Sequence, residues 1–301
     1  MSAGPAQASR LDSCAVTEAG WSSGWRRGWW ADAALVFGAA AVLAQITYPL
    51  LRGDALRAAT MGAVVLFTAA SLAHAAAWWG VWAAGAVLIT AGAIGLAAEA
   101  VGVATGVPFG RYAYAGTLGP QVLGVPVLVP LAWTMMAYPA LLLGRRLAGT
   151  GTGRRARVAA LGGATLAAWD LFLDPQMVAA GHWTWAHPRP SLPGVPAVPL
   201  TNAAGWLLVG TLLVAALDRV LAAHPPSHPP DVAREGLPAA LLLWTWLGST
   251  LANLAFFHRP WVALYGGIGL GLLVAPYLRS LAVDVRAARA AGHRRARPVT
   301  A

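Results

Sequence analysis

Long runs of apolar residues, separated by short polar, Gly-rich or Pro-rich segments, make up most of the chain. Eight runs approach the ~20 apolar residues that a helix needs to cross a bilayer. They cover residues 31–51, 58–79, 82–105, 122–143, 158–175, 203–222, 237–257 and 261–281. This pattern predicts an all-α, polytopic integral membrane protein of about eight transmembrane helices, with Pro175 ending the fifth. Seven spans are the alternative, because the connection at 79–82 is very short and the run at 158–175 is the shortest of the eight.

The two ends of the chain are more polar than its middle. We expect an N-terminal tail over residues 1–28, one transmembrane helical domain over 29–282 and an Arg-rich tail over 283–301. The first segment has no apolar core followed by a small-residue cleavage site, which favours a tail over a signal peptide.

Composition agrees with a membrane protein and charge suggests its orientation. Hydrophobic residues make up 58% of the chain, charged residues only 11%, and the mean hydropathy is +0.60; soluble domains carry about 25% charged residues. All 21 basic residues are Arg, and eight spans would place sixteen of them on one side and five on the other. Since basic residues favour the cytoplasmic side, we expect a multi-pass protein of the cell membrane with both termini in the cytoplasm. The same rule explains the net charge of +10 without a nucleic-acid partner.

Two of the connecting loops share a pattern. With Glu99 aligned to Asp170, residues 110–114 (GRYAY) fall on 181–185 (GHWTW), and both read Gly, basic, aromatic, small, aromatic. After a shift of one residue, a Gly-Val-Pro sequence follows in both copies. An even number of spans separates the copies, so the pattern predicts a parallel internal repeat of spans 3–4 and 5–6. We expect both loops, rich in Gly, Pro and aromatic residues, to pack back onto the helices.

Three acidic residues lie within the predicted spans, near the side with few Arg residues. Glu99 lies about 10 Å from the expected end of its helix at ~1.5 Å per residue, and Asp170 and Asp174 are four residues apart and share a helical face. A charge at this depth costs about 2.5–3.5 kcal/mol unless it faces a cavity or a partner. The acids therefore predict a functional site, and the structural alternative is ion pairing with Arg111 and His182.

The motifs of several other reaction classes are missing from the sequence. It contains no HExxH, CxxC, GxGxxG or phosphate-binding loop motif, and no His cluster with the spacing of metal ligands. Burial favours the neutral form of a carboxyl group, and a second acid nearby favours it further. The sequence therefore predicts proton transfer by carboxyl groups, with no cofactor and no metal.

The same residues resemble a known family. The segments EAVGVATGVPFGRYAY, LGPQVLGVPVLVPLAW, WDLFLDPQMVAAGHWTW and GVPAVPLTNAAGW are similar to CruF-type carotenoid biosynthesis membrane proteins. These are the carotenoid hydratases of bacteria and haloarchaea, a family that includes bisanhydrobacterioruberin hydratase. The resemblance covers residues 95–210 well and the flanking spans only by hydropathy.

The resemblance implies a hydro-lyase of the carotenoid 1,2-hydratase type. Such an enzyme protonates the terminal C=C of an acyclic (ψ) carotenoid end group and adds water to the resulting cation, giving a tertiary alcohol. Glu99, Asp170 and Asp174 would be the catalytic acids, with Asp170 or Glu99 giving the proton and the other positioning water. Residues that would bind substrate or support these acids are Arg111, Tyr112, Tyr114, Trp133, His182, Trp183, Trp185 and Asn202. The implied partners are a lipid-dissolved carotenoid, membrane lipid and other carotenoid biosynthesis enzymes.

Two alternatives remain at this stage. A carotenoid cyclase also begins by protonating a ψ end group, but excludes water. A carotenoid-binding or transport protein would use the same acids as a proton relay or as polar contacts.

Overall fold

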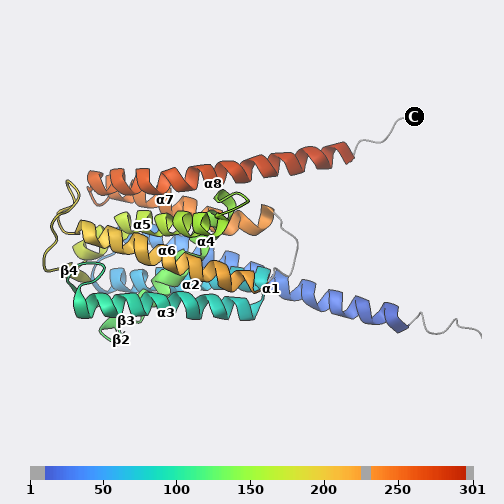
Figure 1. Cartoon of the computed structure of the whole chain (residues 1–301), viewed down its shortest axis with the longest axis horizontal. Coiled ribbons are helices and arrows are strands. Elements are labelled where there is room, and N and C mark those ends of the chain that lie inside the picture. The colour runs from blue at the N-terminus through green and yellow to red at the C-terminus, as the bar shows by residue number, and fades with distance from the viewer. Residues whose placement is uncertain (1–10, 225–231, 296–301) are drawn as a thin grey trace, which may run out of the picture.

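A single bundle of helices makes up the computed structural model, which describes residues 11–224 and 232–295 (Figure 1). Its α-helices are α1 (Leu11–Thr47), α2 (Gly53–Trp79), α3 (Val81–Thr105), α4 (Leu128–Leu147), α5 (Arg154–Ala179), α6 (Leu200–Ala222), α7 (Gly236–Ala255) and α8 (Pro260–Arg295). Its short elements are the 3-10 turns η1 (Tyr48–Leu50) and η2 (Val232–Glu235) and the strands β1 (Tyr112–Tyr114), β2 (Gln121–Val122), β3 (Val125–Pro126) and β4 (Trp183–Trp185).

Helices suit these apolar segments because a helix satisfies its own backbone hydrogen bonds where lipid offers no water. Seven of the described helices are long and apolar enough to cross a membrane. The other, α4, has two Arg residues in its last turn, and it contacts α2, α3, α5, α6, α7 and α8 and is largely buried by them. The prediction of an all-α polytopic membrane protein with about eight helices is confirmed.

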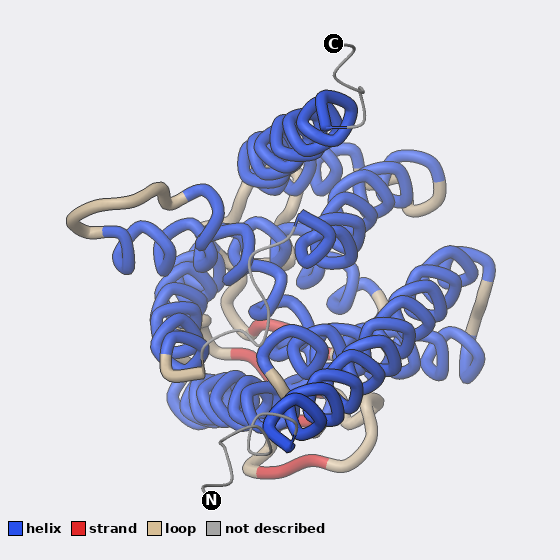
Figure 2. The backbone as a smooth tube through the Cα atoms, turned by 90° about the vertical axis from the view of Figure 1, so that its right-hand side faces the viewer, coloured by secondary structure: helices blue, strands red, loops and turns tan. Residues whose placement is uncertain are grey.

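The two ends of the bundle differ in character. The strands gather at one end, here called the aromatic end, and the loop 148–153 lies at the other, here called the basic end (Figure 1). The described parts of α1 and α8 both project from the basic end, and Figure 2 looks at the bundle from that side. Helix α1 begins at Leu11 and α8 continues to Arg295, so helix extends into both segments expected to be tails; residues 1–10 and 296–301 lie outside the described residues.

Only Gly80 separates α2 from α3. Its φ of 88° lies in a region that residues with a side chain rarely adopt. Its backbone N–H bonds to the carbonyl of Ala76 and completes the last turn of α2. The chain thus reverses at one residue, and the shortest predicted connection is a true boundary between two helices.

Two predicted boundaries were wrong. The fourth helix begins at Leu128 and not at residue 122, because Gln121–Val122 pairs with Val125–Pro126 in a small hairpin. Pro175 does not end the fifth helix, which continues to Ala179. A proline removes one helical N–H donor, and α5 tolerates this loss near its end, where the N–H of Ala180 still bonds to the carbonyl of Gln176.

The loops of the internal repeat pair with each other across the aromatic end. Strands β1 and β4 are antiparallel, with the register Tyr112–Trp185, Ala113–Thr184 and Tyr114–Trp183. In the repeat, Tyr112 corresponds to Trp183 and Tyr114 to Trp185. A local two-fold rotation that exchanges the two strands therefore places the Tyr112–Trp185 pair on the Tyr114–Trp183 pair. The helix contacts follow the same symmetry: α3 is equivalent to α5 and α4 to α6, and α3 contacts α6 just as α5 contacts α4. Phe109 and Trp185 are buried, which confirms that these loops pack onto the helices.

Candidate functional site

Glu99 lies between two glycines on the buried face of α3. Gly95, Glu99 and Gly102 are four and three residues apart and therefore share one face of the helix. A Cβ atom on Gly95 would lie 2.8 Å from the Trp133 side chain, and one on Gly102 would lie 2.9 Å from the Tyr112 hydroxyl. The missing side chains therefore allow aromatic rings to reach the carboxyl group from both sides.

Three aromatic side chains donate hydrogen bonds to Glu99, which is 5% exposed. The Trp133 Nε1–H donates to Oε1 at 3.0 Å, the Tyr114 hydroxyl donates to Oε2 at 2.8 Å, and the Tyr112 hydroxyl also donates to Oε2. Burial, reinforced by the charge of Glu99, raises the pKa of both tyrosines, which lie in β1 outside the helices, so they remain phenols that donate. These three donors occupy most of the acceptor capacity of the Glu99 carboxyl group. A carboxylate has about four acceptor sites, so Oε1 has room for one more donor.

Asp170 and Asp174 meet around the side-chain amide of Asn202. The Nδ2 group of Asn202 donates to Oδ2 of Asp170 at 2.8 Å and to Oδ2 of Asp174. The two carboxyl groups are also within hydrogen-bonding distance of each other. Because α5 continues past Pro175, Asp174 lies inside the helix and is only 3% exposed. Two adjacent carboxyl groups in a dry interior cannot both ionise, so this pair holds a proton.

A cavity of about 60 Å³ brings the two groups of acids together. Glu99, Asp174 and Asn202 line it, whereas Asp170 lines a separate, smaller cavity. Aromatic residues form much of the remaining wall: Phe109, Tyr112, Tyr114, Trp133, Trp183, Trp185 and Trp206. The cavity therefore combines a carboxyl group with three hydrogen-bond donors, a second carboxyl group that is paired through Asn202, and ring faces.

The aromatic walls are held by contacts between the two halves of the repeat. Trp133 on α4 and Trp206 on α6 stack with ring centroids 4.0 Å apart and an interplanar angle of 15°. Each tyrosine of β1 packs against a tryptophan of β4, with centroids 5.6 Å apart in both pairs. In the described part of the chain, no group of three or more His, Cys, Asp or Glu side chains converges as metal ligands would.

Two residues expected to support the acids lie elsewhere. Arg111 is exposed and makes no ion pair with the described residues. His182 is buried, but its Nδ1 hydrogen-bonds to the Thr117 hydroxyl at 2.7 Å and not to a carboxyl group. Burial lowers the pKa of His182, an effect that the charge of Arg57 increases. The structural alternative of ion pairing with Arg111 and His182 is therefore wrong, and the acids bond to Tyr, Trp and Asn instead.

The sequence prediction missed several residues of this site, among them Trp206, Gly95 and Gly102. Trp206 lies four residues after Asn202, so helical periodicity could have placed it on the same face of α6. Gly95 and Gly102 flank Glu99 at helical spacing, a pattern that indicates close approach to α3. Local sequence patterns do not reveal which aromatic side chains fill the space beside Gly95 and Gly102, because these contacts join distant parts of the chain.

Comparison with known proteins shows the family of the chain. Residues 59–274, which include every acid of the site, match the family described as carotenoid biosynthesis protein. The chain belongs to the carotenoid biosynthesis protein family. It is also 38% identical over 124 residues to bisanhydrobacterioruberin hydratase of Haloarcula japonica, a match that covers 39% of each chain. The alignment thus spans well under half the length of that relative, and no solved structure matches.

In this carotenoid biosynthesis protein, a second cavity adjoins the first. It has a volume of about 160 Å³, and the two cavities share the wall residues Thr60, Val64, Leu173 and Met177. Its other walls are mainly apolar and aromatic, and a hydrogen bond of 2.6 Å from Trp244 to Gln45 closes part of its rim. The acids therefore lie at the polar end of a longer apolar path through the bundle.

Proposed function

We propose that this protein is a carotenoid hydratase, which adds water to the terminal C=C of an acyclic carotenoid end group. One observation carries the proposal: Glu99, held by three donors, lies across an aromatic cavity from the Asp170–Asp174 pair. The membership of the carotenoid biosynthesis family and the hydratase name of the Haloarcula japonica relative support the substrate class and the reaction.

Asp174 is the proton donor in this proposal. It lines the cavity, whereas Asp170 does not, and Asn202 links the two carboxyl groups. The Oδ1 atom of Asp170 is buried and has no hydrogen-bond partner among the described residues. A negative charge on Asp170 would therefore be poorly stabilised, which favours the protonated form before the reaction. In this proposal both carboxyl groups are protonated before the reaction, so once Asp174 gives up its proton a single negative charge is shared by a pair that Asn202 already binds.

Glu99 is the base that receives the proton of the attacking water. Its two oxygens accept three hydrogen bonds and one acceptor site on Oε1 is left, which suits a bound water molecule. The charge of Glu99 also lowers the energy of a cation formed in the same cavity. A positioned base of this kind contributes roughly 10²–10⁴-fold to a rate.

The reaction balances without any other reactant. Asp174 protonates the CH carbon of the terminal double bond, and the π electrons of that bond form the new C–H bond. The positive charge develops on the dimethyl-substituted carbon, where the faces of Trp133 and Trp183 stabilise it. Water forms a C–O bond to this carbon and loses a proton to Glu99, leaving a tertiary alcohol. Transfer of that proton back to the aspartate pair completes the cycle.

The adjoining cavity of about 160 Å³ suits the rest of the substrate. A carotenoid is a long, rigid hydrocarbon that dissolves in the bilayer, and the cavity walls include Phe67, Met135 and Phe172. In the proposal the polyene lies there, with its end group beside Glu99 and Asp174.

The test is expression of the full chain in cells that accumulate lycopene. A hydroxylated carotenoid that is heavier by one water molecule supports the proposal. An isomer of unchanged mass would indicate a cyclase, and bound but unaltered pigment would indicate a binding protein; either result overturns hydration. The variants E99Q and D174N should each lose at least ~100-fold in conversion. The matched control is D54N, which exchanges an acid for an amide at an exposed position of the aromatic end.

We further propose that the basic end faces the cytoplasm and that the membrane is the cell membrane. The chain has a single cysteine, Cys14, on the N-terminal side of the first span. A maleimide that does not cross membranes should label Cys14 in inverted vesicles and leave it unlabelled in intact cells. Labelling in intact cells would reverse the orientation.

A further inference from the structure

A large charged cavity lies at the basic end of the bundle, away from the carboxyl site. Its volume is about 1030 Å³, and residues of α2, α4, α5, α6, η2 and α8 line it. Six Arg and three acidic side chains face it, which gives these lining residues a net charge of +3. The proposed carotenoid reaction uses none of these side chains.

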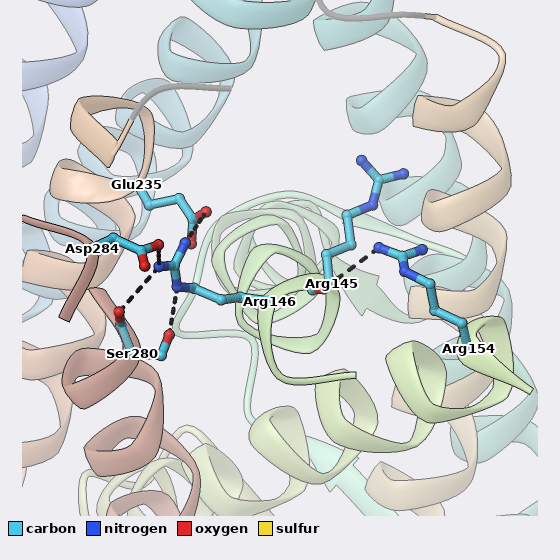
Figure 3. A network of polar contacts seen from close by, with 6 residues as sticks. All are labelled: Arg145, Arg146, Arg154, Glu235, Ser280 and Asp284. Carbon is cyan, nitrogen blue, oxygen red and sulfur yellow. Dashed lines mark hydrogen bonds and ion pairs between the residues drawn. The ribbon is translucent and has the colours of Figure 1, made fainter. Parts of the chain in front are cut away.

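Two of the Arg residues are already neutralised by acids. Arg145 donates through Nε to Asp218 at 2.7 Å and through Nη2 to the carbonyl of the same residue at 3.0 Å. Arg146 donates to Glu235 at 3.1 Å, to the Ser280 hydroxyl and to Asp284, a network drawn in Figure 3. These contacts hold α4 to α6, η2 and α8. The three acids of the cavity therefore have a structural role, which is to pair with Arg145 and Arg146.

The other four Arg residues have no carboxylate partner in the described part of the chain. Arg154 donates only to the backbone carbonyl of Arg145, at 3.4 Å (Figure 3). Arg155 and Arg279 are exposed toward the cavity without an ion pair. Arg234 lies over the ring of Trp79 at 5.1 Å, and its Nε atom is buried without a hydrogen bond. Positive charge therefore remains uncompensated in one concave site.

The start of α5 adds to this positive charge. A helix N-terminus carries partial positive charge and is normally accompanied by acidic residues. The first turn of α5 contains no acid but has Arg154 and Arg155, and no side chain caps it at Gly153. Like charges that are placed together without compensation indicate that an anion from outside the chain completes the site.

We propose that this cavity binds the phosphate group of an anionic phospholipid. Arg guanidinium groups bind phosphate oxygens in a bidentate manner, and basic pockets between membrane helices bind lipid headgroups. The cavity lies where helices end, at the level of headgroups, and Leu142, Leu221 and Val283 give its wall an apolar part for acyl chains. This apolar wall favours a lipid over free inorganic phosphate as the source of the group.

Binding is measured on the purified full chain in a neutral detergent, by native mass spectrometry and thermal unfolding. The probes are dioctanoyl phosphatidylglycerol, dioctanoyl phosphatidylcholine and inorganic phosphate at matched ionic strength. We expect saturable binding of phosphatidylglycerol with a rise in Tm, and much weaker effects of the other two probes. The variant R154Q/R155Q should weaken phosphatidylglycerol binding at least ~10-fold, because each lost charged hydrogen bond is worth about tenfold or more.

The matched control is R219Q/R286Q, which removes two exposed Arg residues of α6 and α8 that do not line the cavity. Equal weakening in both double variants would overturn the proposal, since it would show attraction by overall charge. Inorganic phosphate that binds as tightly as the lipid, with the same loss in R154Q/R155Q, would overturn the lipid source. If R154Q/R155Q does not fold, R279Q takes its place, and unchanged lipid binding in R279Q counts against the site.

Discussion

Replacing Glu99 with Gln should lower the stability of the fold, and the hydrogen bonds of this side chain show by how much. The carboxylate accepts from Trp133 on one oxygen and from Tyr112 and Tyr114 on the other. The amide has only one oxygen. The indole N–H of Trp133 cannot rotate, so we expect the amide oxygen to face Trp133 and the amide nitrogen to face the two phenols.

Both phenol hydroxyls must then turn to accept from the amide. Tyr112 has another acceptor for its own proton, the backbone carbonyl of Glu99 at 3.3 Å. Tyr114 has no second acceptor in the described structure, so E99Q leaves the hydroxyl of this half-buried residue unsatisfied. A fully buried unsatisfied donor costs about 1–3 kcal/mol, so we expect a loss of stability of about 1 kcal/mol.

A double-mutant cycle tests this reasoning. Y114F removes the unsatisfied hydroxyl, so E99Q/Y114F should unfold at a lower cost than the sum of its single variants. Stability is measured by thermal unfolding in detergent, and activity by carotenoid conversion in cells that make lycopene. E99Q should lose at least ~100-fold in activity, and the double variant should recover stability without recovering activity.

Three results would refute the argument. Wild-type stability of E99Q would mean that the phenols do not depend on the carboxylate. Additive costs in the double variant would mean that Tyr114 is not the unsatisfied group. Wild-type conversion by E99Q would remove Glu99 from the proposed reaction.

Three further substitutions probe other parts of the site. N202A removes the donor that the aspartates share, so conversion should fall at least ~10-fold with the protein still folded; unchanged conversion would contradict the shared amide. G102A places a methyl group 2.9 Å from the Tyr112 hydroxyl and should cost about 1–3 kcal/mol on unfolding, whereas G85A, with nothing within 4 Å, should not; equal costs would refute the close approach. Burial lowers the pKa of His182 below 6.5, so its protonation favours the unfolded chain and stability should fall as the pH drops below ~6.5. H182Q should flatten this decline in an unfolding series against pH, and an unaltered decline would assign it to other groups.

The helices were largely predictable from sequence because a lipid environment restricts each spanning segment on its own. A spanning segment must be apolar and must satisfy its own backbone, so the runs ending near Trp79 and Thr105 give helices with the expected ends. The repeat was also visible, since it fixed aromatic residues at equal spacing from Glu99 and Asp170.

What the sequence did not reveal depends on distant contacts. Residue 122 belongs to a hairpin and not to α4, because Gln121–Val122 finds a partner strand. The position of Asp174 inside α5 depends on a proline that the helix tolerates. Arg111 is exposed and forms no ion pair with the described acids, and Glu99 bonds to Tyr and Trp side chains instead.

The two halves of the repeat are alike in fold but unlike in chemistry, one carrying a carboxylate and the other a proton-sharing pair. A substrate bound between them meets its proton donor on one side only. In the proposed reaction run in D₂O, deuterium would therefore enter the CH₂ group beside the new alcohol from a single face. The product would have a single configuration at the CHD carbon. The configuration of the released product would therefore show from which side of the cavity the proton was delivered.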